Sequence, residues 1–144
     1  MFSKACEYGI KATIFIAVRS LHNNRVSLKE IAKEIDSPEA FTAKILQSLA
    51  KNGLVDSHKG PTGGFQMERT KMDTINLYDI VNAIDGDSIF HGCGLGLKQC
   101  DSRKPCPVHH KFVVVRENLT HMLQNTTMYE LATGLDIGLT HLKR

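Results

Sequence analysis

Residues 27–70 constrain the fold most, because two short helical patterns follow one another there and a Gly/Pro turn between alternating segments comes next. Ser27-Leu28-Lys29-Glu30 has the form of a capping box, in which a Ser hydroxyl and a Glu carboxylate satisfy free amide groups at a helix start. A second helix is predicted from Ser37-Pro38, with Ser37 as the N-cap, to about Asn52. Two helices joined by a turn of a few residues are typical of a helix-turn-helix.

A β-hairpin is predicted next, because residues 54–59 and 65–69 alternate on either side of Gly60-Pro61-Thr62-Gly63-Gly64. Apolar residues at three- and four-residue steps predict further helices over residues 3–22 and 74–84. The sequence therefore predicts a mainly α fold with a small β-hairpin wing. Residues 1–84 would form a winged helix-turn-helix DNA-binding domain.

The second helix of a helix-turn-helix fits the major groove of DNA, where hydroxyl and amide groups read base edges and Lys side chains contact phosphates. We expect four apolar residues of this helix to be buried, namely Phe41, Ile45, Leu46 and Leu49. The candidate DNA contacts on the helix are Ser37, Thr42, Lys44, Gln47, Ser48 and Lys51, and those in the wing are His58, Lys59, Thr62, Gly63 and Gly64. A three-helix scaffold used for protein contacts is the alternative.

The charge distribution is a modest signal in the same direction. The net charge is +3, and residues 1–70 hold ten Lys and Arg against seven Asp and Glu, so the basic excess lies in the predicted DNA-binding half. No apolar run has the roughly 20 residues that span a bilayer, and no signal peptide is evident. We therefore expect a cytoplasmic protein without membrane contact, in which cysteines stay reduced.

Three of the four cysteines lie in a polar loop, residues 85–107, with the spacing Cys93-x6-Cys100-x5-Cys106-x2-His109. Clustered thiolates bind iron–sulfur clusters or zinc. Zinc ligands usually come in close pairs two to four residues apart, so the wide gaps favour a 2Fe–2S or 4Fe–4S cluster, with His109 in reach as a fourth ligand. Zinc, and exposed thiols that oxidise in pairs without metal, remain the alternatives.

Cys6 and Glu7 lie on the first predicted helix. Cys6 falls on its apolar stripe and is expected to be a buried core residue. Glu7 and Lys11 are four residues apart, which favours a surface ion pair, and a carboxylate ligand donated to a partner's cluster is the alternative. The sequence contains no phosphate-binding loop, nucleophile elbow or paired carboxylates at catalytic spacing, so we do not expect an enzyme.

The C-terminal part contains a predicted dimerisation helix. Apolar residues at three- and four-residue spacing on a helix over residues 108–124 form a coiled-coil-like seam, Phe112, Val115, Leu119 and Met122. The same helix of a second chain is the simplest partner for it. Thr127-Met128-Tyr129-Glu130 predicts a short helix that completes the segment 108–132. Residues 133–144 are expected to be a loose tail.

These motifs resemble one family. S-L-K-E-I-A-K-E-I, K-I-L-Q-S-L-A-K-N-G-L-V, K-G-P-T-G-G-F and I-N-L-Y-D-I-V-N-A-I-D-G, with the three-cysteine loop, are similar to the IscR/NsrR/CymR (Rrf-type) family of bacterial winged-helix regulators over residues 1–132. The resemblance implies a homodimer with crossed long helices that binds a two-fold symmetric double-stranded DNA operator. It also implies an iron–sulfur cluster that senses redox state, nitric oxide or cluster supply.

The resemblance also assigns ligands. Cys93, Cys100 and Cys106 match the three ligand cysteines of the family, His109 matches the histidine ligand of one branch, and Glu7 matches an acidic ligand that other branches take from the second protomer. The first gap holds six residues rather than about five. Ala43 stands where the cluster-biogenesis branch has a promoter-discriminating glutamate, so that discrimination does not transfer to this chain.

Overall fold

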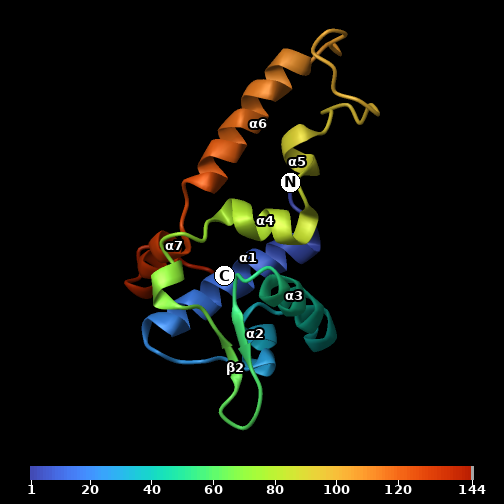
Figure 1. Cartoon of the computed structure of the whole chain (residues 1–144). Helices are drawn as coiled ribbons and strands as arrows, with labels where there is room; N and C mark the ends of the chain where they lie inside the picture. The colour runs from blue at the N-terminus through green and yellow to red at the C-terminus, as the bar shows by residue number, and fades with distance from the viewer. Residues whose placement is uncertain (144) are drawn as a thin grey trace.

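The computed structural model describes residues 1–143 of the chain. Its elements in order are α1 (Lys4–Leu21), α2 (Leu28–Glu34), α3 (Glu39–Lys51), β1 (Asp56–His58), β2 (Gly64–Gln66), the 3-10 turn η1 (Arg69–Lys71), α4 (Leu77–Asp85), α5 (Ser88–His91), α6 (His109–Gln124) and α7 (Met128–Asp136). Figure 1 shows the β-hairpin at one end of the molecule and α6 projecting from the other. None of the helices in residues 1–143 has the length and apolar character needed to cross a bilayer.

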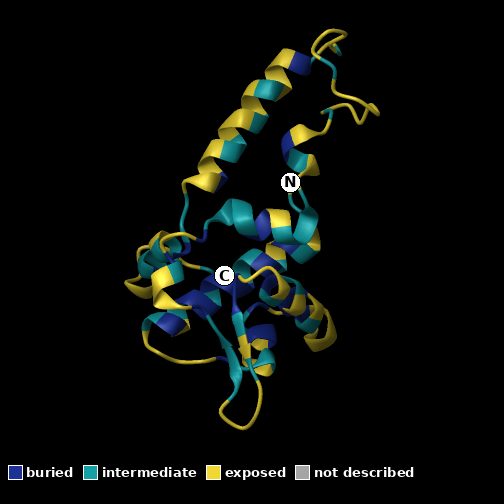
Figure 2. Cartoon of the chain, viewed as in Figure 1, coloured by how far each residue is buried: buried dark blue, intermediate teal, exposed yellow. Residues whose placement is uncertain are grey.

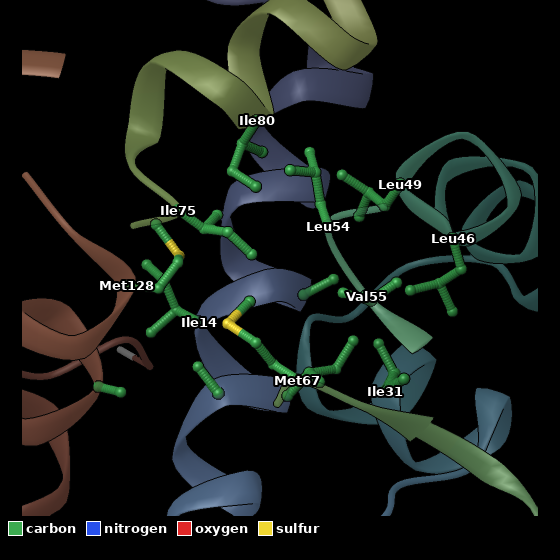
Figure 3. Packing of buried hydrophobic residues seen from close by; sticks show 14 of the residues in the cluster. Ile14, Ile31, Leu46, Leu49, Leu54, Val55, Met67, Ile75, Ile80 and Met128 are labelled. Atoms are coloured by element: carbon green, nitrogen blue, oxygen red, sulfur yellow. The ribbon is translucent and has the colours of Figure 1, made fainter. Parts of the chain in front are cut away.

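Helix α1 lies at the centre of the fold, where α3, α4 and α7 pack around it. Its apolar stripe is buried, and Ala12, Ile16 and Ala17 have no exposed surface. Figure 3 shows how side chains from the surrounding elements meet α1 in one core, among them Ile31, Leu46, Leu49, Val55, Met67, Ile80 and Met128. Each large apolar side chain buried in this way stabilises the fold by about 1.5–3 kcal/mol relative to exposure.

Side-chain caps set the starts of several helices. The Ser27 hydroxyl accepts from the Glu30 backbone N–H at 3.2 Å, and the Thr127 hydroxyl accepts from the Glu130 N–H at 3.2 Å. Both predicted helix starts are therefore confirmed. A reciprocal capping box between Asn76 and Asp79 starts α4 at Leu77, three residues later than the predicted start.

The predicted start of α3 is wrong in detail. Pro38 occupies the N-cap position, and no side chain of residues 1–143 caps this helix. The Ser37 hydroxyl instead lies within hydrogen-bond distance of the Thr42 hydroxyl, at 3.0 Å. Phe41, which we expected to be buried, is 36% exposed and contacts the ring of Tyr8 edge-on, with ring centroids 5.8 Å apart.

The wing is an antiparallel pair of β1 and β2, with Ser57 opposite Phe65. Glycine is required at its turn, because a Cβ atom on Gly63 would lie 2.2 Å from the carbonyl oxygen of His58. Arg25 braces the wing from outside the hairpin, since its guanidinium donates to the carbonyl oxygen of Thr62 at 3.2 Å and to Gln66 Oε1 at 3.1 Å.

The predicted structureless loop of residues 85–107 contains a short helix, α5, which the sequence analysis missed. Its Phe90 is buried and stacks on Tyr78 of α4, with ring centroids 4.6 Å apart. A second apolar cluster forms here from Cys6, Val81, Phe90 and Leu123. This cluster joins the start of α1, α4 and α5 to the C-terminal half of α6.

The predicted loose tail from residue 133 is also wrong for its first residues, because α7 continues to Asp136. Asp136 Oδ1 lies 2.8 Å from His22 Nε2, and Lys143 Nζ lies 3.3 Å from Glu34 Oε2. Leu142 packs against the main core. The segment that follows α7 is thereby attached to α1 and α2; Arg144 lies outside the described residues.

Candidate nucleic-acid interface and cysteine site

The exposed face of α3 presents three of the predicted DNA contacts. Lys44, Gln47 and Lys51 are exposed. They are separated by three and four residues and therefore share one side of the helix. The opposite side, with Ile45, Leu46 and Leu49, is buried in the core as expected. The face carries one amide and two ammonium groups, the chemistry that base edges and phosphates can accept.

Two predicted contacts on α3 are directed elsewhere. Thr42 is fully buried, and its hydroxyl donates to the carbonyl oxygen of Pro38 at 2.8 Å, so it is not the exposed side chain we expected. The Ser48 hydroxyl is half-buried and donates to the carbonyl oxygen of Ala83 at 3.2 Å, which ties α3 to α4. Ser37 is half-buried beside Thr42.

The wing presents Lys59 and Thr62 as exposed residues at its tip, while Gly63 and Gly64 are half-buried. His58 is half-buried at the base, where its Nε2 atom is buried without a hydrogen-bond partner among the described residues. Sequence reasoning missed Arg25, the brace of this wing. It lies between two helices in a segment without periodicity, and only its pairing with Thr62 reveals its role.

The predicted cysteine ligands and His109 lie along the N-terminal half of α6. The sulfur of Cys100 lies 3.3 Å from His109 Nδ1, and His109 is the first residue of α6 and is buried. The Cys106 thiol is one of the neighbours that lower the pKa of Cys93. No group of three or more possible metal ligands occurs in residues 1–143. All four cysteines are free thiols.

Cys93 has an environment that favours the thiolate. The backbone N–H of Leu95 donates to its sulfur at 3.4 Å. This bond, followed by that from the Leu97 backbone, lowers the pKa of Cys93 below its ordinary value. The thiolate is the form that binds metals.

Arg116 also contacts this site, although the sequence analysis did not single it out. Its Nη2 atom donates to Cys100 Sγ at 3.5 Å, and its Nη1 atom donates to the carbonyl oxygen of Gly92. A half-buried Arg on a helix carries no sequence signal of such a contact. Only the folded path of the loop reveals it.

The structure brings His109, and not Glu7, next to a cysteine. Glu7 is exposed on α1 and pairs with Lys4, with Lys4 Nζ and Glu7 Oε2 3.5 Å apart, rather than with Lys11 as predicted. The ammonium of Lys11 lies over the ring of Tyr8 instead, 4.9 Å from its centroid. Cys6 is fully buried as predicted.

Much of helix α6 is exposed, as Figure 2 shows, and several of its exposed residues are apolar. Of the predicted seam, Phe112, Val115 and Met122 are 37%, 59% and 47% exposed. Leu119 is half-buried and packs partly against the second apolar cluster. The buried residues of α6 are His109 and Leu123.

A winged helix-turn-helix with a basic recognition face, joined to a projecting helix and a cysteine loop, defines a class of transcription regulators. The chain belongs to the Rrf2 family, because the family model described as "Iron-dependent Transcriptional regulator" matches residues 2–134. The resemblance inferred from the motifs and the predicted fold class are confirmed.

Curated relatives agree with this assignment. An HTH-type transcriptional regulator of Aquifex aeolicus is 31% identical over 133 residues, which cover 91% of this chain and 90% of that protein. The transcriptional regulator IscR of Erwinia tasmaniensis is 27% identical over 130 residues, covering 90% of this chain and 77% of IscR. These relatives are transcription regulators, which confirms the prediction that the chain is not an enzyme.

Solved structures share the fold. CymR of B. subtilis, described as the global cysteine regulator, superposes with a TM-score of 0.74 at 22% identity over 92% of this chain and 96% of CymR. IscR of T. potens superposes with a TM-score of 0.74 at 20% identity over 99% of this chain and 93% of IscR. An oxidised form of Staphylococcus aureus CymR has a TM-score of 0.72 at 25% identity, over 92% of this chain and 95% of CymR.

Proposed function

We propose that the chain is a cytoplasmic, homodimeric, DNA-binding regulator whose affinity for a two-fold symmetric operator is set by an iron–sulfur cluster. Cys93, Cys100, Cys106 and His109 would hold the cluster, and Glu7 from the partner protomer is the alternative to His109. The observation that carries the proposal is the contact of the Cys100 sulfur with His109 Nδ1 at the start of α6, on the loop that also holds Cys93 and Cys106, at the opposite end of the molecule from the wing (Figure 1).

The donor set fits such a cluster chemically. Three sulfurs and one imidazole supply four ligands, and the N–H donor to Cys93 favours its thiolate. The loop must bring the Cys93–Cys106 pair and the Cys100–His109 pair together around the cluster. When bound, the cluster supplies a one-electron redox centre that reacts with oxidants and nitric oxide.

Lys44, Lys51 and Lys59 are proposed to neutralise phosphates, and Gln47 to read a base edge in the major groove. Thr62 and the backbone of Gly63 and Gly64 would approach the adjacent sugar–phosphate backbone. Burial removes Thr42 from this set, and its bond to Ala83 removes Ser48. Ser37 contacts Thr42 at the start of α3 and is proposed to support this helix rather than to contact DNA.

The recognition helices α3 of the two chains must lie about 34 Å apart to enter successive major grooves on one side of a duplex. The α6 helices of two chains are proposed to set this distance by packing along Phe112, Val115, Leu119 and Met122. The cysteine loop lies at the start of the same helix. A change in how the loop is held would alter the packing of α6 and move one recognition helix out of its groove. Specific binding exceeds non-specific binding by about 4–10 kcal/mol, so the loss of one half-site is enough to release an operator.

The sensor test compares wild-type protein purified anaerobically with Cys93→Ala, Cys100→Ala and Cys106→Ala. We expect the wild type to be brown and to contain iron and acid-labile sulfide, and each variant to lose the colour. His109→Ala and Glu7→Ala separate the two candidates for the fourth ligand, since only one of them should bleach the protein. Colourless wild-type protein that holds zinc instead would exclude the cluster and support a zinc-stabilised loop.

The DNA test uses a duplex selected from a random-sequence pool by the brown protein, with binding followed by fluorescence anisotropy. Removal of the cluster should change the affinity for this duplex and leave the affinity for unselected duplex unchanged. Failure to select any sequence would contradict the regulator and favour use of the three-helix scaffold for protein contacts.

Thiol oxidation is the second candidate for the sensor, and the proximity of two cysteines favours it. Cys106 lies near enough to Cys93 to lower its pKa, and a relative of 25% identity has been solved in an oxidised form. The two thiols would form one disulfide and pass two electrons and two protons to a peroxide. Metal-free protein treated with peroxide distinguishes this route, because it predicts a reversible Cys93–Cys106 bond together with altered DNA affinity.

A further inference from the structure

One side chain of α6 joins two distant points of the cysteine loop. The Arg116 guanidinium donates from Nη1 to the carbonyl oxygen of Gly92, one residue before Cys93. It also donates from Nη2 to the sulfur of Cys100, at 3.5 Å. A planar guanidinium can bridge two acceptors in this way, whereas the single ammonium of a lysine presents one point charge.

The charge of Arg116 has no carboxylate partner within ion-pair distance in residues 1–143. The guanidinium of Arg116 contacts the Cys100 sulfur instead, and this sulfur also lies 3.3 Å from His109 Nδ1. The negative partner that suits Arg116 is therefore a cysteine thiolate or an anionic group bound to the cysteine sulfur. Hydrogen bonds to an ionised acceptor are about twice as strong as those between neutral groups.

A second contact holds the same part of the loop on the same helix. Gly94 lies against the ring of Phe112, because a Cβ atom on Gly94 would come within 2.4 Å of a ring carbon. Phe112 and Arg116 are four residues apart on α6 and lie one above the other. The stretch from Gly92 to Cys100 is thus attached to α6 by a polar contact and an apolar one.

We propose that Arg116 is the positioning residue that fastens the cysteine loop onto α6 and holds Cys100 beside His109. Its importance for sensing rests on the proposed cluster, while its attachment of the loop does not. With a cluster bound, the guanidinium would favour the state carrying the additional electron, since positive charge and N–H donors near the sulfurs stabilise the reduced form. Arg116 would also pass any movement of the Cys100 segment directly to the dimerisation helix.

Hydrogen exchange of the metal-free, reduced protein tests the attachment without a cluster. Arg116→Gln removes the charge, and Arg116→Lys keeps the charge but cannot bridge both acceptors. We expect the amides of residues 92–106 to exchange about tenfold faster in both variants, the change expected for the loss of a charge-assisted hydrogen bond. The exchange rates of the amides of α1 should be unchanged. Lys98→Gln is the matched control and should exchange like the wild type, because Lys98 is an exposed cation of the same loop with no hydrogen bond or ion pair among the described residues.

Redox titration of the cluster-loaded protein tests the electrostatic part. The midpoint potential should fall in Arg116→Gln, fall less in Arg116→Lys and stay at the wild-type value in Lys98→Gln. A tenfold shift in the ratio of oxidised to reduced cluster corresponds to 59 mV for one electron. A residue with only a structural role would not produce this order among the three variants.

The two measurements separate the two proposals. Wild-type protein without a cluster contradicts the proposed function, and the exchange of residues 92–106 still decides the role of Arg116. Equal exchange in the wild type and in both Arg116 variants overturns that role, whether or not a cluster is present. Faster exchange with an unchanged potential overturns the electrostatic part alone and retains the attachment.

Discussion

Cysteine residues of this chain have opposite acid–base properties because their neighbours differ. Burial is the largest effect that raises the pKa of Cys6 to about 12, and the nearby charge of Asp85 adds to it. At Cys93, backbone N–H groups donate to the sulfur and lower its pKa. Buried Cys6 is therefore kept as a neutral core residue, while Cys93 is prepared for ligation or oxidation. The sequence already separated the two residues, because Cys6 falls on an apolar helical stripe and Cys93 lies in a polar loop.

Cys6 leads to a prediction on alkaline stability. The unfolded chain releases the Cys6 proton near pH 9 and the folded chain near pH 12. Because the folded pKa is raised, the contribution is fully present below about pH 9 and is lost as the pH rises towards 12. In that window the free energy of unfolding should fall more steeply in the wild type than in Cys6→Ala, by up to about 1.4 kcal/mol per pH unit.

Urea unfolding at a series of alkaline pH values measures this difference, and the slopes with pH are compared rather than the absolute stabilities. Cys6→Ala also removes packing in the second apolar cluster and is expected to be less stable at neutral pH. Parallel slopes in the two proteins would show that Cys6 is not held protonated by the fold.

Thr42 illustrates a residue whose burial the sequence pattern contains. It precedes Ile45 and Leu46 by three and four residues, so helical geometry places it on the same face as these core residues. Its hydroxyl suggested a DNA contact, but the hydroxyl is satisfied by the Pro38 carbonyl oxygen within α3. Periodicity is the stronger guide here, because a buried Thr can return its hydrogen bond to its own helix.

At the scale of elements, the helix starts capped by a Ser or Thr side chain were predicted closely, whereas the short helix α5 was missed. The starts at Ser27 and Thr127 follow from short-range chemistry that a sequence displays directly. The four-residue α5 has no cap and too few residues for periodicity, and it is held by the stacking of Phe90 on Tyr78. The attachment of the end of α7 through Asp136, and of the segment after it through Lys143, depends on partners more than 100 residues away, which no local pattern reveals.

The recognition helix leads to a pair of predictions that separate phosphate contact from base contact. Lys44→Ala should weaken binding to any duplex and lower the magnitude of the salt slope, d log K/d log[salt], by about 0.9, because one fewer phosphate is neutralised. Fluorescence anisotropy with a random-sequence duplex at several salt concentrations measures this slope. Lys98→Ala is the control, since it removes the same charge from the cysteine loop at the other end of the molecule, and it should leave the slope unchanged.

Gln47→Ala should behave differently on the same helix. We expect it to weaken binding to a selected operator by about 1–3 kcal/mol and to leave the salt slope as in the wild type, because an amide neutralises no phosphate. Competition between selected and random-sequence duplexes measures this loss of discrimination. An equal loss on both duplexes would mean that Gln47 does not read a base.

At the scale of the whole molecule, α6 contacts the body of the protein, the cysteine loop and solvent. Leu123 is buried in the second apolar cluster, Arg116 and His109 contact Cys100 of the loop, and Phe112, Val115 and Met122 are exposed. The sequence predicted the exposed apolar residues from their spacing and the cysteines from their clustering. It could not predict how the donors pair, because Cys93 with Cys106 and Cys100 with His109 are matched by the path of a loop without periodicity.

The exposed face of α6 leads to the prediction on assembly. Val115 is 59% exposed in the single chain, so Val115→Asp should leave the fold of the monomer intact while placing two carboxylates against an apolar seam in a symmetric dimer. We expect dissociation to monomers and affinity for a selected two-fold operator reduced towards that of one half-site. Sedimentation velocity over a range of protein concentrations measures the first effect, and anisotropy with whole and half operators measures the second.

Gln124→Glu adds the same charge to an exposed position half a turn around the same helix and should remain dimeric. A dimer of Val115→Asp with wild-type stability would place the contact between chains on another surface and would remove α6 as the element that sets the distance between the recognition helices.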